Sequence, residues 1–335
     1  MAEAALSSGE SSALEIPRES IPAQVFLNHF FALNYHIQHN EHAYQLSELP
    51  YLQQFEPQVG EAVMLSVQKH LLNSWNTEYT LRSSAQATDE TYLRHTLHWT
   101  FPQAYYSVQE SLLAMLRLHG ITARQPERII AEGGKLVAKG AYPVAVSFYA
   151  TGNPQQPRMR RLPYGRLNPS LQLLASEPEA QRQIGQFLRT THRQRAQQVR
   201  QAVQANEQLA LRTREGKVLR RFDERHWQQI NWRIGYTTVF DLLSRLRISP
   251  GHREIERFIE ADIDVALFHQ SLLGIVEYLN FVHEAYVVWA FGTDAYQEWL
   301  NGLPDYLRDG FVAERFKQHI AGDGEKEVRD IGIPR

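Results

Sequence analysis

The sequence predicts an all-α protein, because long segments with apolar residues every three or four positions alternate with helix-capping and helix-ending residues. The chain has 335 residues, 43% of them hydrophobic and 21% charged, which suffices for one large or two small domains. It contains no cysteine, and this excludes disulfides, thiolate zinc sites, iron–sulfur clusters and cysteine nucleophiles. Residues 1–20 are rich in Ala, Ser and Glu, so we expect a loose tail and not a signal peptide. A cytoplasmic location is expected.

Three long helices are predicted in the first third of the chain. Residues 22–46 and 59–83 both carry apolar and aromatic side chains at helical spacing. Asp89, within a Thr-Asp-Glu cluster, is expected to cap the third helix, which runs to a stop at Gly120. Pro102 lies inside this helix, so a kink or a break is expected there.

The middle of the chain is less regular. A shorter helix is predicted for residues 126–137, ending at Gly140, and residues 141–170 predict a short strand or extended arm followed by a loop rich in glycine and proline. Residues 176–212 return to a helical pattern that is polar and rich in Gln and Arg. We therefore expect an insertion whose surface differs from that of the surrounding helices.

The last third of the chain gives the clearest pattern. It predicts a helix for residues 227–247, a turn, a helix from Pro250, a long helix for residues 264–291 and an amphipathic helix for residues 305–319. The long helix holds the most apolar segment of the chain, but polar and charged residues interrupt it. It is predicted to be a core helix and not a membrane span, and we expect no membrane partner.

The net charge of −2 hides a strong asymmetry. Residues 158–225 contain 15 Arg or Lys against 6 Asp or Glu, so the rest of the chain is acidic. Arginine dominates lysine, which suits phosphate contacts and stacking on unpaired bases. The arginines predicted to bind RNA are Arg158, Arg160, Arg161, Arg189, Arg193, Arg195, Arg220 and Arg221. The alternative is a solvated helix whose arginines pair with acidic side chains elsewhere in the chain.

The segment from Arg247 to His252 carries the chemistry that we consider most informative. Ser249 and Pro250 are typical of a helix start, which places His252 in the first turn, where the helix dipole favours the neutral imidazole. An imidazole base and a guanidinium that stabilises phosphorane charge are the pair that metal-free RNA cleavage needs. The Arg-x4-His pattern is loose, however, and a solvent-facing arginine with a helix-capping histidine also explains it.

Two segments resemble the HEPN superfamily. Residues 101–122 (FPQAYYSVQESLLAMLRLHGIT) resemble its second helix, with an Ala-Tyr-Tyr start and a Gly-Ile turn, and residues 237–248 (TTVFDLLSRLRI) followed by the Arg247–His252 turn resemble its later half. The resemblance covers roughly residues 60–140 and 227–292. It implies a helical bundle, frequent homodimerisation and a metal-independent ribonuclease with Arg247 and His252 as the catalytic pair. Ile248, where active members usually carry a polar residue, favours the alternative of a non-catalytic RNA- or protein-binding module.

On this basis the chain divides into six expected segments. They are a tail (1–20), an N-terminal helical extension (21–58), the first half of a HEPN-like bundle (59–140), a basic insertion (141–226), the second half of the bundle (227–292), and a C-terminal helix and tail (293–335). A role in stress response or defence would fit a ribonuclease of this type.

No metal and no cofactor are expected. His36, His39 and His42 follow one another at three-residue spacing, but a helix turns the third away from the first, so a surface or subunit-contact cluster is the favoured interpretation. The charged residues near the long C-terminal helix lack the paired Glu-x-x-His motifs of a diiron bundle.

Overall fold

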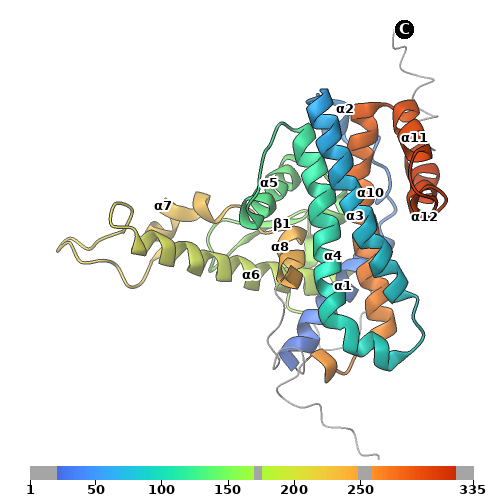
Figure 1. Ribbon diagram of the computed structural model, residues 1–335. Coiled ribbons are helices and arrows are strands. Elements are labelled where there is room, and N and C mark those ends of the chain that lie inside the picture. The colour runs from blue at the N-terminus through green and yellow to red at the C-terminus, as the bar shows by residue number, and fades with distance from the viewer. Residues whose placement is uncertain (1–20, 170–175, 248–257, 322–335) are drawn as a thin grey trace, which may run out of the picture.

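The computed structural model describes residues 21–169, 176–247 and 258–321, and it confirms the all-α class. Three long helices form the centre: α3 (Glu61–Ala85), α4 (Glu90–Leu118) and α10 (Val265–Phe291) pack side by side (Figure 1). Helix α1 (Ile21–Gln38) packs against α10 on one side and against α6 (Glu177–Ala205) on the other. The N-terminal region predicted to be an extension therefore contributes to the main core.

Shorter elements surround these helices. The remaining α-helices are α2 (Pro50–Gln53), α5 (Pro126–Lys139), α7 (Glu224–Ile234), α8 (Val239–Ser244), α11 (Thr293–Asn301), α12 (Asp305–Arg308) and α13 (Phe311–Arg315). The 3-10 segments are η1 (Val144–Val146), η2 (Pro163–Arg166) and η3 (Arg245–Arg247), and a π-helical segment, η4, covers Phe316–Ala321. Strands β1 (Tyr149–Thr151) and β2 (Arg158–Arg160) form an antiparallel hairpin with Ala150 opposite Met159.

Several helix ends follow directly from local sequence. The Asp89 carboxylate accepts hydrogen bonds from the backbone N–H groups of Thr91 and Tyr92, and Asp264 caps α10 in the same way through Leu267. Gly140 ends α5 with a φ of 93°, a conformation that favours glycine. These ends confirm the predicted boundaries. Helix α4, in contrast, continues through Pro102 without a break.

The single helix predicted for residues 227–247 is wrong. Helix α7 ends at Ile234, and Gly235 follows with a φ of 71°. The chain then extends so that Thr237 exchanges two backbone hydrogen bonds with Ala150 of β1, at 2.9 and 3.0 Å. Helix α8 begins only after Thr238, which forms a reciprocal capping box with Asp241. Pairing with a distant strand therefore overrides the local helical pattern.

The C-terminal region also differs from its prediction. Helix α11 was not expected, and the helix predicted for residues 305–319 is divided into α12 and α13 at Gly310. These helices pack on α3 and α10 around Trp75, which is fully buried, and form a second core beside the main one. A third, small core joins the outer part of α6 to α7 through Phe222, Trp227 and Ile230.

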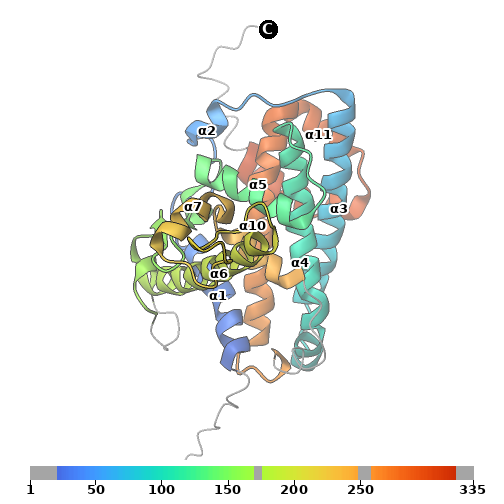
Figure 2. The same cartoon turned by 90° about the vertical axis from the view of Figure 1, so that its left-hand side faces the viewer.

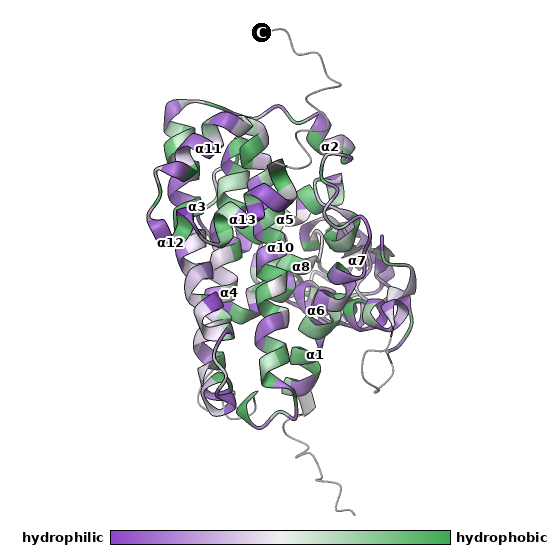
Figure 3. Ribbon diagram, turned by 90° about the vertical axis from the view of Figure 1, so that its right-hand side faces the viewer, coloured by the Kyte–Doolittle hydropathy of each residue, from purple (hydrophilic) through white to green (hydrophobic). Residues whose placement is uncertain are grey.

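Of the described helices, α10 alone is long and apolar enough to cross a membrane by length and composition. In the structure, 67% of its most apolar window is buried inside the bundle. Its buried face includes the polar residues Asn280, His283 and Glu284 (Figure 3 shows the mixed hydropathy of the helix). This burial is what the sequence predicts for a core helix.

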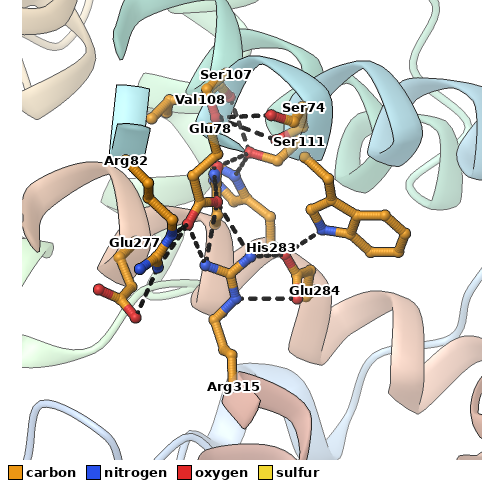
Figure 4. Close-up of polar contacts among 12 residues, drawn as sticks. Ser74, Glu78, Arg82, Ser107, Val108, Ser111, Glu277, His283, Glu284 and Arg315 are labelled. Atoms are coloured by element: carbon orange, nitrogen blue, oxygen red, sulfur yellow. Dashed lines mark hydrogen bonds and ion pairs between the residues drawn. The ribbon is translucent and has the colours of Figure 1, made fainter. Parts of the chain in front are cut away.

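A network of charged side chains lies inside the bundle, where α13 meets α3 and α10 (Figure 4). The Arg315 guanidinium donates to both oxygens of Glu78 at 2.9 and 3.1 Å and to Glu284 at 2.7 Å. Arg82 adds a second cation to Glu78 at 2.9 Å, and the Trp75 indole N–H donates to Glu284 at 2.8 Å. Glu78, Glu284 and Arg315 are all essentially inaccessible to solvent.

The two carboxylates of this network have different electrostatic surroundings. Burial acts to raise the pKa of Glu78, but the charges of Arg315 and Arg82 outweigh it and lower that pKa. Burial raises the pKa of Glu284, because Arg315 is its one cationic partner among the described residues and the charge of Glu78 repels it. The charges of both glutamates raise the pKa of Arg315 despite its burial. The network therefore holds Arg315 protonated between an anion and a more easily protonated carboxyl group.

Candidate nucleic-acid interface

Arg247 lies at the surface, at the end of η3. Its guanidinium is 3.1 Å from the carboxylate of Glu127 in the first turn of α5, and the two side chains are 34% and 74% exposed. The pKa of Glu127 is lowered. The main cause is a hydrogen bond from its own backbone N–H at the start of α5, and the smaller cause is the hydrogen bond and charge of Arg247. Close by, burial raises the pKa of Tyr105 to about 12 in spite of the charge of Arg247. His252 lies outside the described residues, so the predicted catalytic pair stays a prediction.

Three of the eight arginines predicted to bind RNA are engaged in the fold. Arg195 forms an ion pair with Asp241 at 2.7 Å and donates to the carbonyl of Tyr236, tying α6 to the start of α8. Arg161 donates to the carbonyl of Val137, and Arg189 donates to the carbonyls of two residues in and after η2. Each of these three arginines uses at least one N–H donor within the protein and so ties the insertion to the rest of the fold.

The other five arginines predicted to bind RNA are exposed and have no ion pair with any residue in the described ranges. Arg158 and Arg160 lie on β2, Arg193 on α6, and Arg220 and Arg221 in the loop that precedes α7. Exposed, unpaired guanidiniums keep all five donors free for an external anion. Composition locates the basic region, and the structure distinguishes its exposed arginines without an ion pair from those that contact other parts of the fold.

Three of the five free arginines, Arg193, Arg220 and Arg221, lie on one projecting part of the molecule. Residues 189–235, which we call the basic arm, comprise the outer part of α6, the loop after it and α7. They extend away from the bundle in Figure 1 and point toward the viewer in Figure 2. The basic arm contains eleven Arg or Lys residues against four Asp or Glu. A projecting element with this charge concentrates positive potential at a distance from the acidic bundle.

An exposed tryptophan accompanies these charges. Trp232 on α7 is 72% exposed, and the guanidinium of Arg233 lies 4.4 Å from the centre of its ring. Trp232 could not be singled out from the sequence, because a helix pattern alone does not tell which of its aromatic residues face solvent. An exposed indole beside cations is the arrangement on which unpaired bases stack.

A polar cavity of about 420 Å³ lies between the hairpin and α7. Arg158 and Arg160 line it from β2, and Glu224, Gln228 and Asn231 line it from α7. This cavity has no signature in the sequence, because its two walls are separated by more than 60 residues of chain. Two of the free arginines therefore face a concave site as well as open solvent.

The three neighbouring histidines do not form a shared site. His36 is buried, with its ring 3.7 Å from the carboxylate of Glu177, whereas His39 stacks on Tyr35 with ring centres 3.8 Å apart. His42 instead contacts the side chain of Gln45 at 2.6 Å. Within the part of the chain that the structure describes, no group of three or more potential metal ligands occurs.

No protein-family model, curated protein or solved structure matches this chain. The resemblance to the HEPN superfamily, with its ribonuclease activity and homodimer, therefore stays a prediction that rests on the quoted segments.

Proposed function

We propose that this protein binds single-stranded RNA through the basic arm and the adjoining hairpin. The observation that carries the proposal is the division among the arginines. Five are exposed without an ion pair to any described residue, while Arg161, Arg189 and Arg195 donate to backbone carbonyls of the fold. Free guanidiniums bind phosphate oxygens in pairs of parallel hydrogen bonds. In this function the protein acts as an RNA-binding module built on a helical bundle.

Trp232 supports a preference for single strands. Its indole is open to solvent, and the face of a base reaches such a ring only when that base is unpaired. Stacking on an aromatic side chain contributes about 1–3 kcal/mol per base, which is comparable to several exposed phosphate contacts. A single-stranded segment is therefore expected to bind more tightly than a duplex of the same length.

The experiment replaces Arg193, Arg220 and Arg221 together by alanine. Affinity for a fluorescent single-stranded RNA should fall by about tenfold to a hundredfold, because three exposed charge contacts of roughly 0.5–1 kcal/mol each are lost. Fluorescence anisotropy with single-stranded and duplex probes of equal length measures the loss and the strand preference in the same titrations.

A matched control removes the same charge from the bundle. Lys69, Arg124 and Lys317 are exposed, have no ion pair among the described residues, and lie outside the basic arm. Their combined replacement by alanine should leave RNA affinity within about twofold of the unmodified protein, since the lost charges are remote from the arm. Equal losses in the two triple variants would mean that net charge, and not the arm, governs binding.

A second candidate function is RNA cleavage by Arg247 and His252. One observation favours it: the partner of Arg247 is the exposed Glu127, and a surface ion pair of this kind contributes only about 0–1 kcal/mol. The guanidinium is thus free to exchange Glu127 for a phosphate at little cost. His252 follows five positions later and would act as general base or acid.

His252→Ala is expected to reduce RNA cleavage by a factor of about 100 or more, the range of general acid–base catalysis. The thermal unfolding midpoint should change little. Cleavage is measured on labelled RNA with and without EDTA, and activity should persist in the chelator. Cleavage that survives the substitution, or that EDTA abolishes, would reject this mechanism while leaving RNA binding by the arm unaffected.

A further inference from the structure

The cavity between the hairpin and α7 is built by two regular rows of side chains. Arg158 and Arg160 are two positions apart on β2 and flank Met159, which is buried, so both arginines project from the outer face of the strand. Glu224, Gln228 and Asn231 are spaced by four and three residues on α7 and therefore share one face of that helix. Each row lines the same cavity of about 420 Å³.

Opposite charges face this cavity without neutralising each other. Glu224 is exposed, and it forms no ion pair with Arg158, Arg160 or any other residue in the described part of the chain. The side-chain oxygen of Asn231 is buried at the cavity wall and has no hydrogen-bond partner among the residues that the structure describes. Buried polar atoms are nearly always hydrogen-bonded in folded proteins, so an unpartnered acceptor at a cavity indicates a site for a donor.

A complementary ligand carries an anion at one end and hydrogen-bond donors at the other. The two guanidiniums of β2 match a phosphate, and the Glu224 carboxylate offers two acceptor oxygens side by side. Among the four RNA bases, guanine alone presents two adjacent donors, N1–H and the N2 amino group. Adenine and cytosine place an unprotonated ring nitrogen beside their amino group, where it would face the carboxylate, and uracil has a single N–H donor between two carbonyls.

We propose that this cavity binds a guanine nucleotide, with its phosphate at Arg158 and Arg160 and its Watson–Crick edge at Glu224. A volume of about 420 Å³ lies within the range of small-molecule sites. For a guanine within an RNA strand, the inference rests on the proposed function and gives the arm a base preference. A free guanosine monophosphate has the same chemistry and is distinguished from it by experiment.

The first test titrates the full chain with the 5′-monophosphates of guanosine, adenosine, cytidine and uridine by calorimetry. Guanosine monophosphate should bind about 5-fold to 100-fold more tightly than the other three, the discrimination expected of one bidentate contact to a base edge. Glu224→Gln replaces one acceptor oxygen by a donor and should reduce this preference to less than about threefold.

Two controls accompany this variant. Glu207→Gln makes the same charge change at an exposed position of the basic arm outside the cavity, and it should keep the full guanine preference. Arg158→Ala with Arg160→Ala should weaken all four nucleotides by similar factors, because phosphate contacts carry no base information. Equal binding of the four nucleotides, or a guanine preference that persists in Glu224→Gln, would overturn the proposal.

A second experiment distinguishes a guanine within an RNA strand from free guanosine monophosphate. Oligouridine with one central guanosine should bind more tightly than pure oligouridine in the unmodified protein and equally well in Glu224→Gln. Guanosine monophosphate that binds with the expected preference while no RNA binds would support the cavity as a free-nucleotide site and reject the proposed function. RNA that binds through the basic arm with no preference for the guanosine, in the unmodified protein as in Glu224→Gln, would reject the cavity proposal alone.

Discussion

Arg315→Met is expected to lower the free energy of unfolding by about 3–5 kcal/mol, the usual cost of removing one partner from a buried ion pair. Arg315 supplies the charge that Glu284 depends on and shares Glu78 with Arg82. Without it, the indole N–H of Trp75 is the one side-chain donor left to Glu284 within the described ranges, so Glu284 must either stay ionised in the core or take up a proton. Urea unfolding followed by circular dichroism measures the loss.

Arg308→Met provides the matched comparison. Arg308 forms ion pairs with Asp305 and Asp309 on the same C-terminal segment, but its side chain is 39% exposed. Loss of such surface pairs should cost far less than loss of Arg315, because water already solvates both partners. Adding Glu78→Gln and Glu284→Gln to Arg315→Met should recover part of the stability, because no uncompensated charge then remains buried. Similar losses for Arg315→Met and Arg308→Met would contradict the account of the buried network.

Acid is expected to destabilise the protein through two buried histidines before most carboxylates titrate. Burial lowers the pKa of His283 from 6.5 to about 3 and that of His29 to about 4. The unfolded chain binds protons on both residues as the pH falls below about 6.5, whereas the folded protein does not. The folded state is therefore most stable with respect to these two histidines above pH 6.5. Its stability declines as the pH falls below 6.5, and the full loss is reached once the pH falls below the folded pKa of each histidine.

Between pH 7 and pH 4, each of these histidines should lower the free energy of unfolding by roughly 3 kcal/mol, since one unit of pKa shift corresponds to about 1.4 kcal/mol. Glu284 acts in the opposite direction, because its raised pKa lets the folded state take up a proton first. The clean measurement is thus the difference between the unmodified protein and His283→Gln, in urea unfolding from pH 7 to pH 4. The variant should lose about 3 kcal/mol less over this range. Parallel pH profiles would show that His283 does not stay neutral in the fold.

Sequence reasoning succeeds here where the cause of a structure is local. Asp89, Asp264 and Gly140 act on backbone groups within four residues of themselves, so the ends of α4, α10 and α5 follow from the sequence. The break at Gly235 could not be predicted in this way. It depends on the pairing of Thr237 with Ala150, which lies 87 residues earlier in the chain.

The proposed binding surface also combines features that depend on local sequence with features that depend on distant residues. Composition identifies the basic region, but whether an arginine is free depends on partners that folding brings to it, as Asp241 is brought to Arg195. The buried position of Arg315 has no signature in its own segment, because its partner Glu78 is 237 residues away in sequence. The cavity at Glu224 forms only where the hairpin and α7 meet, and the sequence of neither element indicates that it will contact the other.

The salt dependence of RNA binding shows whether the arginines of the basic arm and hairpin contact phosphates. If the free arginines of the basic arm and hairpin contact phosphates, three to five such contacts give a slope of about −2 to −3.5 in a plot of log affinity against log salt concentration for a single strand. Replacing Arg193, Arg220 and Arg221 by alanine removes three such contacts and should make that slope less steep by about 2. Binding of the unmodified protein that does not change with salt, or a slope that is the same in this triple variant, would contradict the account.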